Sequence, residues 1–298
     1  DMFKRFALTL ALICASTYGQ AQSKMETIAS MSIIADFVRQ IGGERVNVTT
    51  LVAAGGDAHT FQPAPQDARR VAQAKLVFIN GLGLEGWLPR LVQSSGSKAR
   101  IITVSQGVQA IRDTSDADGH SHAHDLDPHA WQNVANAKIY IRNIAQALSA
   151  ADAEGAPTYA ARADAYLAEL DRLDADIRAG LATIPPERRR IITSHDAFGY
   201  FAKAYGMNFI APQGVSTEAE ASSRDVARII RQIRAEKIPA VFLENISDPR
   251  LMVQIARETG AKMGAPLFSD SLSPESGPAP TYLAMMRNNL KAFLDALR

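Results

Sequence analysis

Residues 157–182, PTYAARADAYLAELDRLDADIRAGLA, form the longest regular pattern in this 298-residue sequence. Apolar side chains recur there at steps of three and four residues, while Asp and Arg fill the opposite side. This spacing predicts an amphipathic helix of about 26 residues and about 39 Å, at 1.5 Å per residue. Pro157 can open the helix in its first turn, and Pro185-Pro186 ends it. A helix of this length can bridge two lobes.

Short apolar strands alternate with helices on both sides of residues 157–182. This alternation predicts an α/β fold in which parallel sheets are covered on both faces. We therefore expect an N-terminal lobe at 22–155, a linking helix at 156–184 and a C-terminal lobe at 185–298. The predicted strands are 27–31, 46–52, 76–79 and 101–104, then 190–194, 208–210, 240–243 and 265–268. The predicted helices include 34–41, 65–74, 84–93, 134–150, 198–205, 223–236, 249–259 and 282–297.

Residues 1–21 have the composition of a cleaved signal peptide. Lys4-Arg5 precede an apolar run at 6–15, and the small residues at 19–21 suit a cleavage site. The run is too short to span a bilayer. The single cysteine, Cys14, lies in this segment behind Ile13, which favours a freely exported periplasmic protein over a lipoprotein. The mature chain would then have no disulfide and no thiolate metal ligand.

The charge balance excludes a strongly basic protein. The formal net charge is +1, and Lys4, Arg5 and Asp1 of the predicted signal peptide account for it. The remaining neutral body gives no electrostatic reason to expect nucleic acid or an anionic membrane as a partner.

The six histidines fall into two groups. His120, His122 and His124 lie in an Asp-, Ser-, Gly- and His-rich stretch at 113–128, which we predict to be an exposed loop. His129 follows this loop, while His59 and His195 stand alone. The crowded trio is either an ordinary solvated loop or a weak accessory site that gathers zinc.

Four residues far apart in the sequence are candidates for one metal site. His59, His129 and His195 each follow a predicted strand, as does Asp270. Ligands in parallel sheets bind beyond the carboxyl ends of the strands, so a cleft between two lobes could collect all four. Three imidazoles and one carboxylate suit a four-coordinate Zn²⁺. By spacing alone, each residue is more often an ordinary surface or core residue than a ligand.

The local motifs around these residues occur in an order that is similar to one family. The chain resembles the solute-binding proteins of zinc- and manganese-type ABC importers (cluster A-I) from about residue 25 to its end. The motifs are Gly56-Asp57-Ala58-His59-Thr60-Phe61-Gln62-Pro63, Ile79-Asn80-Gly81, Leu84-Glu85-Gly86-Trp87, Asp127-Pro128-His129-Ala130-Trp131, Thr193-Ser194-His195-Asp196-Ala197-Phe198, Leu243-Glu244-Asn245 and Ser269-Asp270-Ser271-Leu272.

The resemblance implies two (β/α) lobes, one rigid connecting helix and one metal ion in the cleft between the lobes. It carries the ligand role onto His59, His129, His195 and Asp270. Manganese members typically have Glu at the position of His195, so the imidazole here favours zinc. We therefore expect a periplasmic, monomeric, high-affinity zinc-binding protein that delivers Zn²⁺ to an ABC permease and is not an enzyme. A zinc metallochaperone is a second candidate partner.

Several alternatives remain open at this stage. A manganese-binding protein of the same family is one, and a sugar or amino-acid binding protein is another. A zinc hydrolase would need an open position on the metal, which would exist if Asp270 were not a ligand and Glu244 acted as a base. Candidate residues to orient the imidazoles are Asn80, Asp57, Asp196 and Glu244. Trp87 and Trp131 are expected to pack and carry no chemistry.

Overall fold

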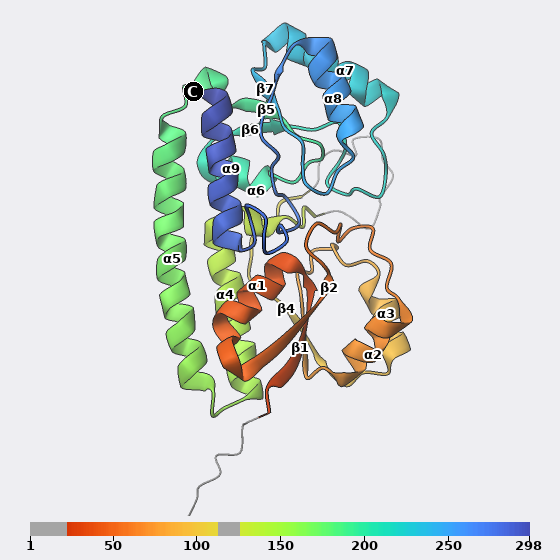
Figure 1. The fold of residues 1–298 in the computed structure, drawn as a ribbon, viewed down its shortest axis with the longest axis vertical. Coiled ribbons are helices and arrows are strands. Elements are labelled where there is room, and N and C mark those ends of the chain that lie inside the picture. The colour runs from red at the N-terminus through yellow and green to blue at the C-terminus, as the bar shows by residue number, and fades with distance from the viewer. Residues whose placement is uncertain (1–22, 113–125) are drawn as a thin grey trace, which may run out of the picture.

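The computed structural model describes residues 23–112 and 126–298, which form two α/β lobes beside one long helix (Figure 1). The strands are β1 (Met25–Met31), β2 (Val46–Val52), β3 (Leu76–Ile79), β4 (Arg100–Thr103), β5 (Arg190–Ile192), β6 (Asn208–Ile210), β7 (Ala240–Val241) and β8 (Lys262–Met263). They pair in parallel in the orders β2-β1-β3-β4 and β6-β5-β7-β8. The predicted α/β class with parallel sheets in two lobes is therefore confirmed.

Helices cover both sheets. They are α1 (Ser32–Gly42), α2 (Pro65–Gln73), α3 (Leu88–Ser95), α4 (Val134–Ala151), α5 (Ala156–Ala182), α6 (Gly199–Tyr205), α7 (Ser223–Glu236), α8 (Pro249–Thr259) and α9 (Tyr282–Leu297). Three short 3-10 turns are η1 (Gly43–Arg45), η2 (Ala130–Gln132) and η3 (Pro186–Arg188). Figure 1 shows α1 and α4 on one side of the first sheet and α2 and α3 on the other.

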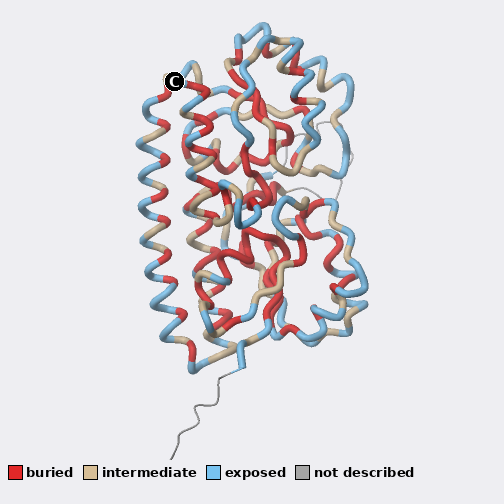
Figure 2. The backbone as a smooth tube through the Cα atoms, in the orientation of Figure 1, coloured by how far each residue is buried: buried red, intermediate tan, exposed pale blue. Residues whose placement is uncertain are grey.

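Helix α5 runs the length of the molecule past both lobes (Figure 1). It packs on α1 and α4 in the first lobe and on α6 and α9 in the second. On its inner face Tyr159, Leu170 and Ile177 are fully buried, whereas the opposite face is exposed (Figure 2). The predicted long helix is thus present, one residue longer than the repeat at 157–182.

Two predicted elements are misplaced. The last strand is at Lys262–Met263 and not at 265–268, where Leu267 forms only an isolated bridge with Glu244. Pro266 has no N–H to continue a ladder, which explains the interruption. Helix α3 begins at Leu88 and not at 84, because Pro89 suits only the first turn of a helix.

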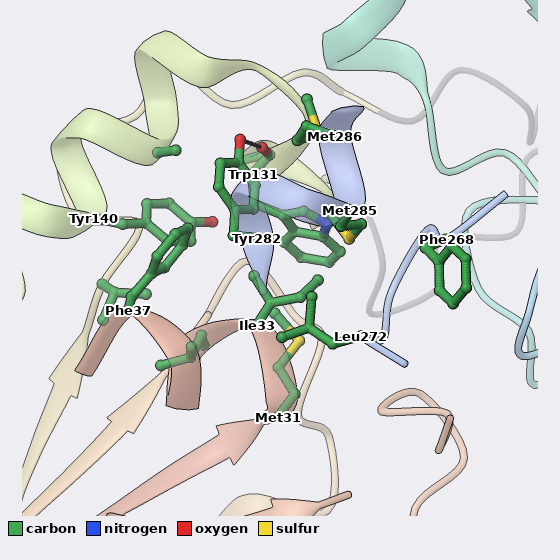
Figure 3. Packing of buried hydrophobic residues seen from close by; sticks show 14 of the residues in the cluster. Met31, Ile33, Phe37, Trp131, Tyr140, Phe268, Leu272, Tyr282, Met285 and Met286 are labelled. Carbon is green, nitrogen blue, oxygen red and sulfur yellow. Dashed lines mark hydrogen bonds between the residues drawn. The ribbon is translucent and has the colours of Figure 1, made fainter. Parts of the chain in front are cut away.

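Within the part of the chain that the structure describes, the buried apolar residues form two separate clusters. One large cluster fills the first lobe and continues between the lobes, where Phe37 of α1, Trp131 of η2 and Tyr282 of α9 meet (Figure 3). The rings of Phe37 and Tyr282 have centroids 4.8 Å apart. A separate cluster lies in the second lobe between β5, β7, α7 and α8; its members include Ile192, Ile229, Val241 and Ile255. Among residues 23–112 and 126–298, no helix has the length and apolar character needed to cross a membrane.

Candidate metal centre

Four side chains from separate loops converge where the two sheets face each other. His59 follows β2, His129 precedes η2, His195 follows β5, and Asp270 lies between β8 and α9. His59 is 6% exposed, and the other three residues are at most 1% exposed. The structure therefore brings together all four residues singled out in the sequence, in a place closed to bulk water.

The side-chain atoms that could bind a metal ion are nearly equidistant. Oδ2 of Asp270 lies 3.2 Å from Nε2 of His59, 3.4 Å from Nε2 of His129 and 3.2 Å from Nε2 of His195. Nε2 of His129 lies 3.3 Å from Nε2 of both other histidines. The sixth separation, between His59 and His195, is within 4.8 Å.

These separations match the edges of a small coordination tetrahedron. A regular tetrahedron with edges of about 3.3 Å has its centre about 2.0 Å from each corner, which is the length of a Zn–N or Zn–O bond. Five of the six edges described above have this length. Neither oxygen of Asp270 receives a well-aligned hydrogen bond from the described residues. A buried carboxylate without such donors is strongly stabilised by a cation. The donor set and its spacing therefore fit a divalent metal ion.

His129 is oriented by Asp127, two residues before it. Oδ1 of Asp127 accepts a hydrogen bond from the backbone N–H of His129 at 2.9 Å and lies 2.8 Å from its Nδ1. A proton on Nδ1 directs Nε2 toward the centre of the cluster. Burial alone would lower the pKa of His129, but the carboxylates of Asp270 and Asp127 outweigh it and raise that pKa to about 9.

His195 has an equivalent partner in Glu244 of the second lobe. Nδ1 of His195 lies 2.5 Å from Oε2 of Glu244, close enough for an ion pair but without the alignment of a hydrogen bond. Oε1 of the same carboxylate accepts from the backbone N–H of His195 at 2.9 Å. Burial opposes the charged imidazole, yet the carboxylates of Glu244 and Asp270 hold the pKa of His195 well above its usual range.

His59 is held by its own turn and by a tryptophan. Oδ1 of Asp57 accepts from the backbone N–H of His59 at 2.8 Å. Nε1 of Trp87 donates to the carbonyl of Ala58 at 2.8 Å. Burial lowers the pKa of His59, so this imidazole is the one most readily neutral and able to bind metal.

Asp270 belongs to a segment that is bonded to the first lobe on both sides. The carbonyl of Ser269 accepts from Nε1 of Trp131 and from Nε2 of Gln132, both at 2.9 Å. Two residues after Asp270, the backbone N–H of Leu272 donates to Oγ of Ser32 at 2.9 Å. Burial would raise the pKa of Asp270, but the imidazoles of His129 and His195 hold it well below its usual range.

A buried network supports the chain before His129. Nδ2 of Asn80 donates to the carbonyl of Pro128 at 2.9 Å, and Oδ1 of Asn80 accepts from the hydroxyl of Tyr140. The backbone N–H of Asn80 donates to Glu85 at 2.7 Å. Glu85 also accepts from Ser30, and burial raises its pKa. Asn80 therefore holds the backbone before His129 in place and makes no hydrogen bond with an imidazole of the site.

The structure corrects several expectations about this region. Asp127 is only 3% exposed, so the predicted exposed loop at 113–128 does not extend to it. The backbone N–H of Asp196 donates to the carbonyl of Gly214, and a role of its side chain in orienting an imidazole stays a prediction. Trp87 and Trp131 pack as expected, but both also donate hydrogen bonds near the site. Sequence reasoning missed Asp127 and Glu85, although both stand inside the quoted motifs.

Some expectations concern residues outside those that the structure describes. These are the signal peptide at 1–21 with Cys14 and the accessory histidines His120, His122 and His124. An accessory metal role for the three histidines stays a prediction.

Comparison with known proteins points to one family. Residues 28–296 match the family model described as zinc-uptake complex component A, periplasmic. The manganese ABC transporter substrate-binding lipoprotein PsaA of Streptococcus anginosus is 33% identical over 301 residues, covering 98% of this chain and 96% of that protein. The Mn-bound periplasmic metal binding protein from Candidatus Liberibacter asiaticus has a TM-score of 0.82 at 33% identity, covering 93% of this chain and 100% of that one. The periplasmic zinc binding protein TroA from Treponema pallidum has a TM-score of 0.84 at 28% identity, covering 92% and 99%.

Proposed function

Because this chain belongs to the family of zinc-uptake complex component A, we propose that it captures Zn²⁺ with high affinity and delivers it to the permease of an ABC importer. Family membership makes it the metal-binding component of an ABC importer and a solute-binding protein, not an enzyme. The zinc hydrolase considered from the sequence is therefore set aside. The proposed ligands are Nε2 of His59, His129 and His195 together with Oδ2 of Asp270.

The single observation that supports zinc as the bound ion is the tetrahedral set of three imidazoles and one carboxylate. Imidazole nitrogen suits zinc, whereas manganese prefers oxygen ligands in octahedral geometry. His195 decides the balance between nitrogen and oxygen donors, and therefore between zinc and manganese. A carboxylate at this position would give two nitrogen and two oxygen donors. Each of two imidazoles also has a carboxylate behind it, Asp127 for His129 and Glu244 for His195, which raises the basicity of the ligand.

Manganese is the second candidate because PsaA and the Liberibacter structure carry that metal in their names. A competition titration separates the two. The purified, metal-free protein is titrated with Zn²⁺ and with Mn²⁺ against chelators of known affinity, and the bound metal is counted. We expect one tightly held Zn²⁺ per chain, with Mn²⁺ weaker by more than a factor of ten. Equal affinity, or tighter Mn²⁺, would refute the zinc assignment.

Delivery would take place outside the cytoplasmic membrane. We propose a periplasmic protein, in keeping with the predicted signal peptide at 1–21 and with the periplasmic relatives. We also propose that it acts as a monomer and that His120, His122 and His124 hold zinc only weakly. The receiving permease must open the site, since all four proposed ligands are buried.

A further inference from the structure

One carboxylate links the two lobes beside the metal centre. Oδ2 of Asp57, in the first lobe, accepts a hydrogen bond from Oγ1 of Thr217, in the second, at 2.6 Å. The other oxygen of Asp57 accepts from the backbone N–H of His59. Both residues are half-buried. Because the acceptor is ionised, this hydrogen bond is stronger than one between neutral groups.

Thr217 is in turn attached to the backbone that carries His195. Nε2 of Gln213 donates to the carbonyl of Thr217 at 3.2 Å, and Gln213 pairs with His195 in a parallel bridge. The backbone N–H of Asp196 donates to Gly214 at 3.2 Å. The Asp57–Thr217 hydrogen bond therefore connects the turn that presents His59 to the loop that lies against His195.

This hydrogen bond also borders a cavity whose lining includes a residue adjacent to one of the proposed ligands. Asp57 and Thr217 line a cavity of about 490 Å³ together with Ser194 and Ser247. Ser194 directly precedes His195, and His59 is the most exposed of the four proposed ligands at 6%. An ion that leaves on this side passes between the turn of His59 and the loop of Thr217.

We propose that Asp57 and Thr217 are positioning residues whose hydrogen bond holds the His59 turn against the second lobe and sets the rate at which the metal ion is released. The proposal rests on the proposed metal-binding function. The bond must break before the turn and the loop can separate, so its loss accelerates release while the four ligands remain present.

The test compares release rates of Thr217 variants. Thr217→Val replaces the hydroxyl by a methyl group of similar size, and Thr217→Ser keeps the hydroxyl. Ser247→Ala is the matched control. It also removes a hydroxyl from this cavity, but the hydroxyl of Ser247 makes no hydrogen bond with Asp57. Each zinc-loaded protein is mixed with an excess of a chromogenic chelator, and release is followed from milliseconds to hours. Thr217→Ala repeats the test with a smaller side chain.

We expect Thr217→Val to release zinc about tenfold faster, the factor that corresponds to about 1.4 kcal/mol. Thr217→Ser and Ser247→Ala should stay within about twofold of the unmodified protein. Equal rates for Thr217→Val and the unmodified protein, or the same acceleration in all variants, would overturn the proposal. If the unmodified protein binds no Zn²⁺, the proposed function fails instead, and the comparison is repeated with whichever divalent ion, Mn²⁺ or Cd²⁺, it does bind.

Discussion

Removing the carboxylate behind His129 tests how the centre is built. In Asp127→Ala, the backbone N–H and Nδ1 of His129 lose the oxygen that lies 2.9 and 2.8 Å away. His129 is fully buried, so bulk water does not solvate these two donors. Loss of such a partner typically weakens metal binding 10- to 100-fold, or about 1.4–2.8 kcal/mol. This range agrees with the cost of about 1–3 kcal/mol for leaving a buried donor unpaired.

Protons compete with the metal ion for His129, so the difference in affinity between Asp127→Ala and the unmodified protein depends on pH. In the metal-free protein the pKa of His129 is raised to about 9, and metal can bind only after the proton leaves. The apparent affinity of the unmodified protein therefore rises with pH as this proton is lost. Asp127→Ala lowers this pKa, because it removes one of the two carboxylates that favour the proton. The variant thus suffers less proton competition, and its deficit should be smallest in acid and largest near pH 9.

The assay is chelator competition at pH 6.0, 7.5 and 8.5 on the unmodified protein, Asp127→Ala and Asp127→Asn. The asparagine keeps the acceptor oxygen without the charge and should fall between the other two. Circular dichroism checks that both variants fold. Equal zinc affinities at pH 8.5, or a deficit that grows toward acid, would contradict the orienting role of Asp127.

Four further outcomes are expected. His59→Ala and Asp270→Ala should each weaken zinc at least 100-fold in the same competition assay, and near-normal affinity in both would exclude the proposed ligand set. His195→Glu should narrow the preference for Zn²⁺ over Mn²⁺ at least tenfold, because it exchanges a nitrogen for an oxygen donor; an unchanged ratio would speak against His195 as the selective ligand. Zinc at 1,000 times its Kd should stabilise the fold by about 4 kcal/mol, seen in calorimetry as a rise in Tm that His59→Ala abolishes; an equal rise in the variant would indicate binding elsewhere. Deletion of 118–125 should slow zinc acquisition slightly without changing the single tight site, and identical acquisition rates and stoichiometry would remove any role for the loop histidines.

The sequence was informative where local pattern and tertiary structure agree. The repeat at 157–182 predicted α5 because a surface helix needs only one apolar face to pack. His59 and His195 became candidates because parallel strands place their following loops at one edge, and the resemblance to the family then carried the ligand role onto them. Asp127 was not found, since its polar surroundings in the sequence resemble a solvated loop. Its burial depends on contacts with the second lobe, including the hydroxyl of Tyr200, which donates to its carbonyl at 2.8 Å.

The path of the chain around Asp270 could not be predicted from the sequence either. A strand at 265–268 would have attached Asp270 to the second sheet, in the same way that β5 attaches His195. Pro266 interrupts that strand, and the chain crosses to the first lobe before it reaches Asp270. No local pattern reports such a crossing, because Trp131 and Ser32, the residues that receive it, are more than a hundred positions away.

This crossing makes the contributions of the two lobes to the proposed site unequal. His59 and His129 are fastened to the first lobe, and His195 is carried by the second with its partner Glu244. The segment of Asp270 is hydrogen-bonded to both lobes, since Leu272 donates to Ser32 and Nδ2 of Asn245 donates to the carbonyl of Ser271. If the lobes parted, the donors of one lobe would leave a bound ion before those of the other, and a coordination position would become free. An incoming donor from a receiving protein could occupy that position before the remaining bonds break. Such an order of events is an associative ligand exchange, in which the ion passes from one protein to the next without being released as a hydrated species.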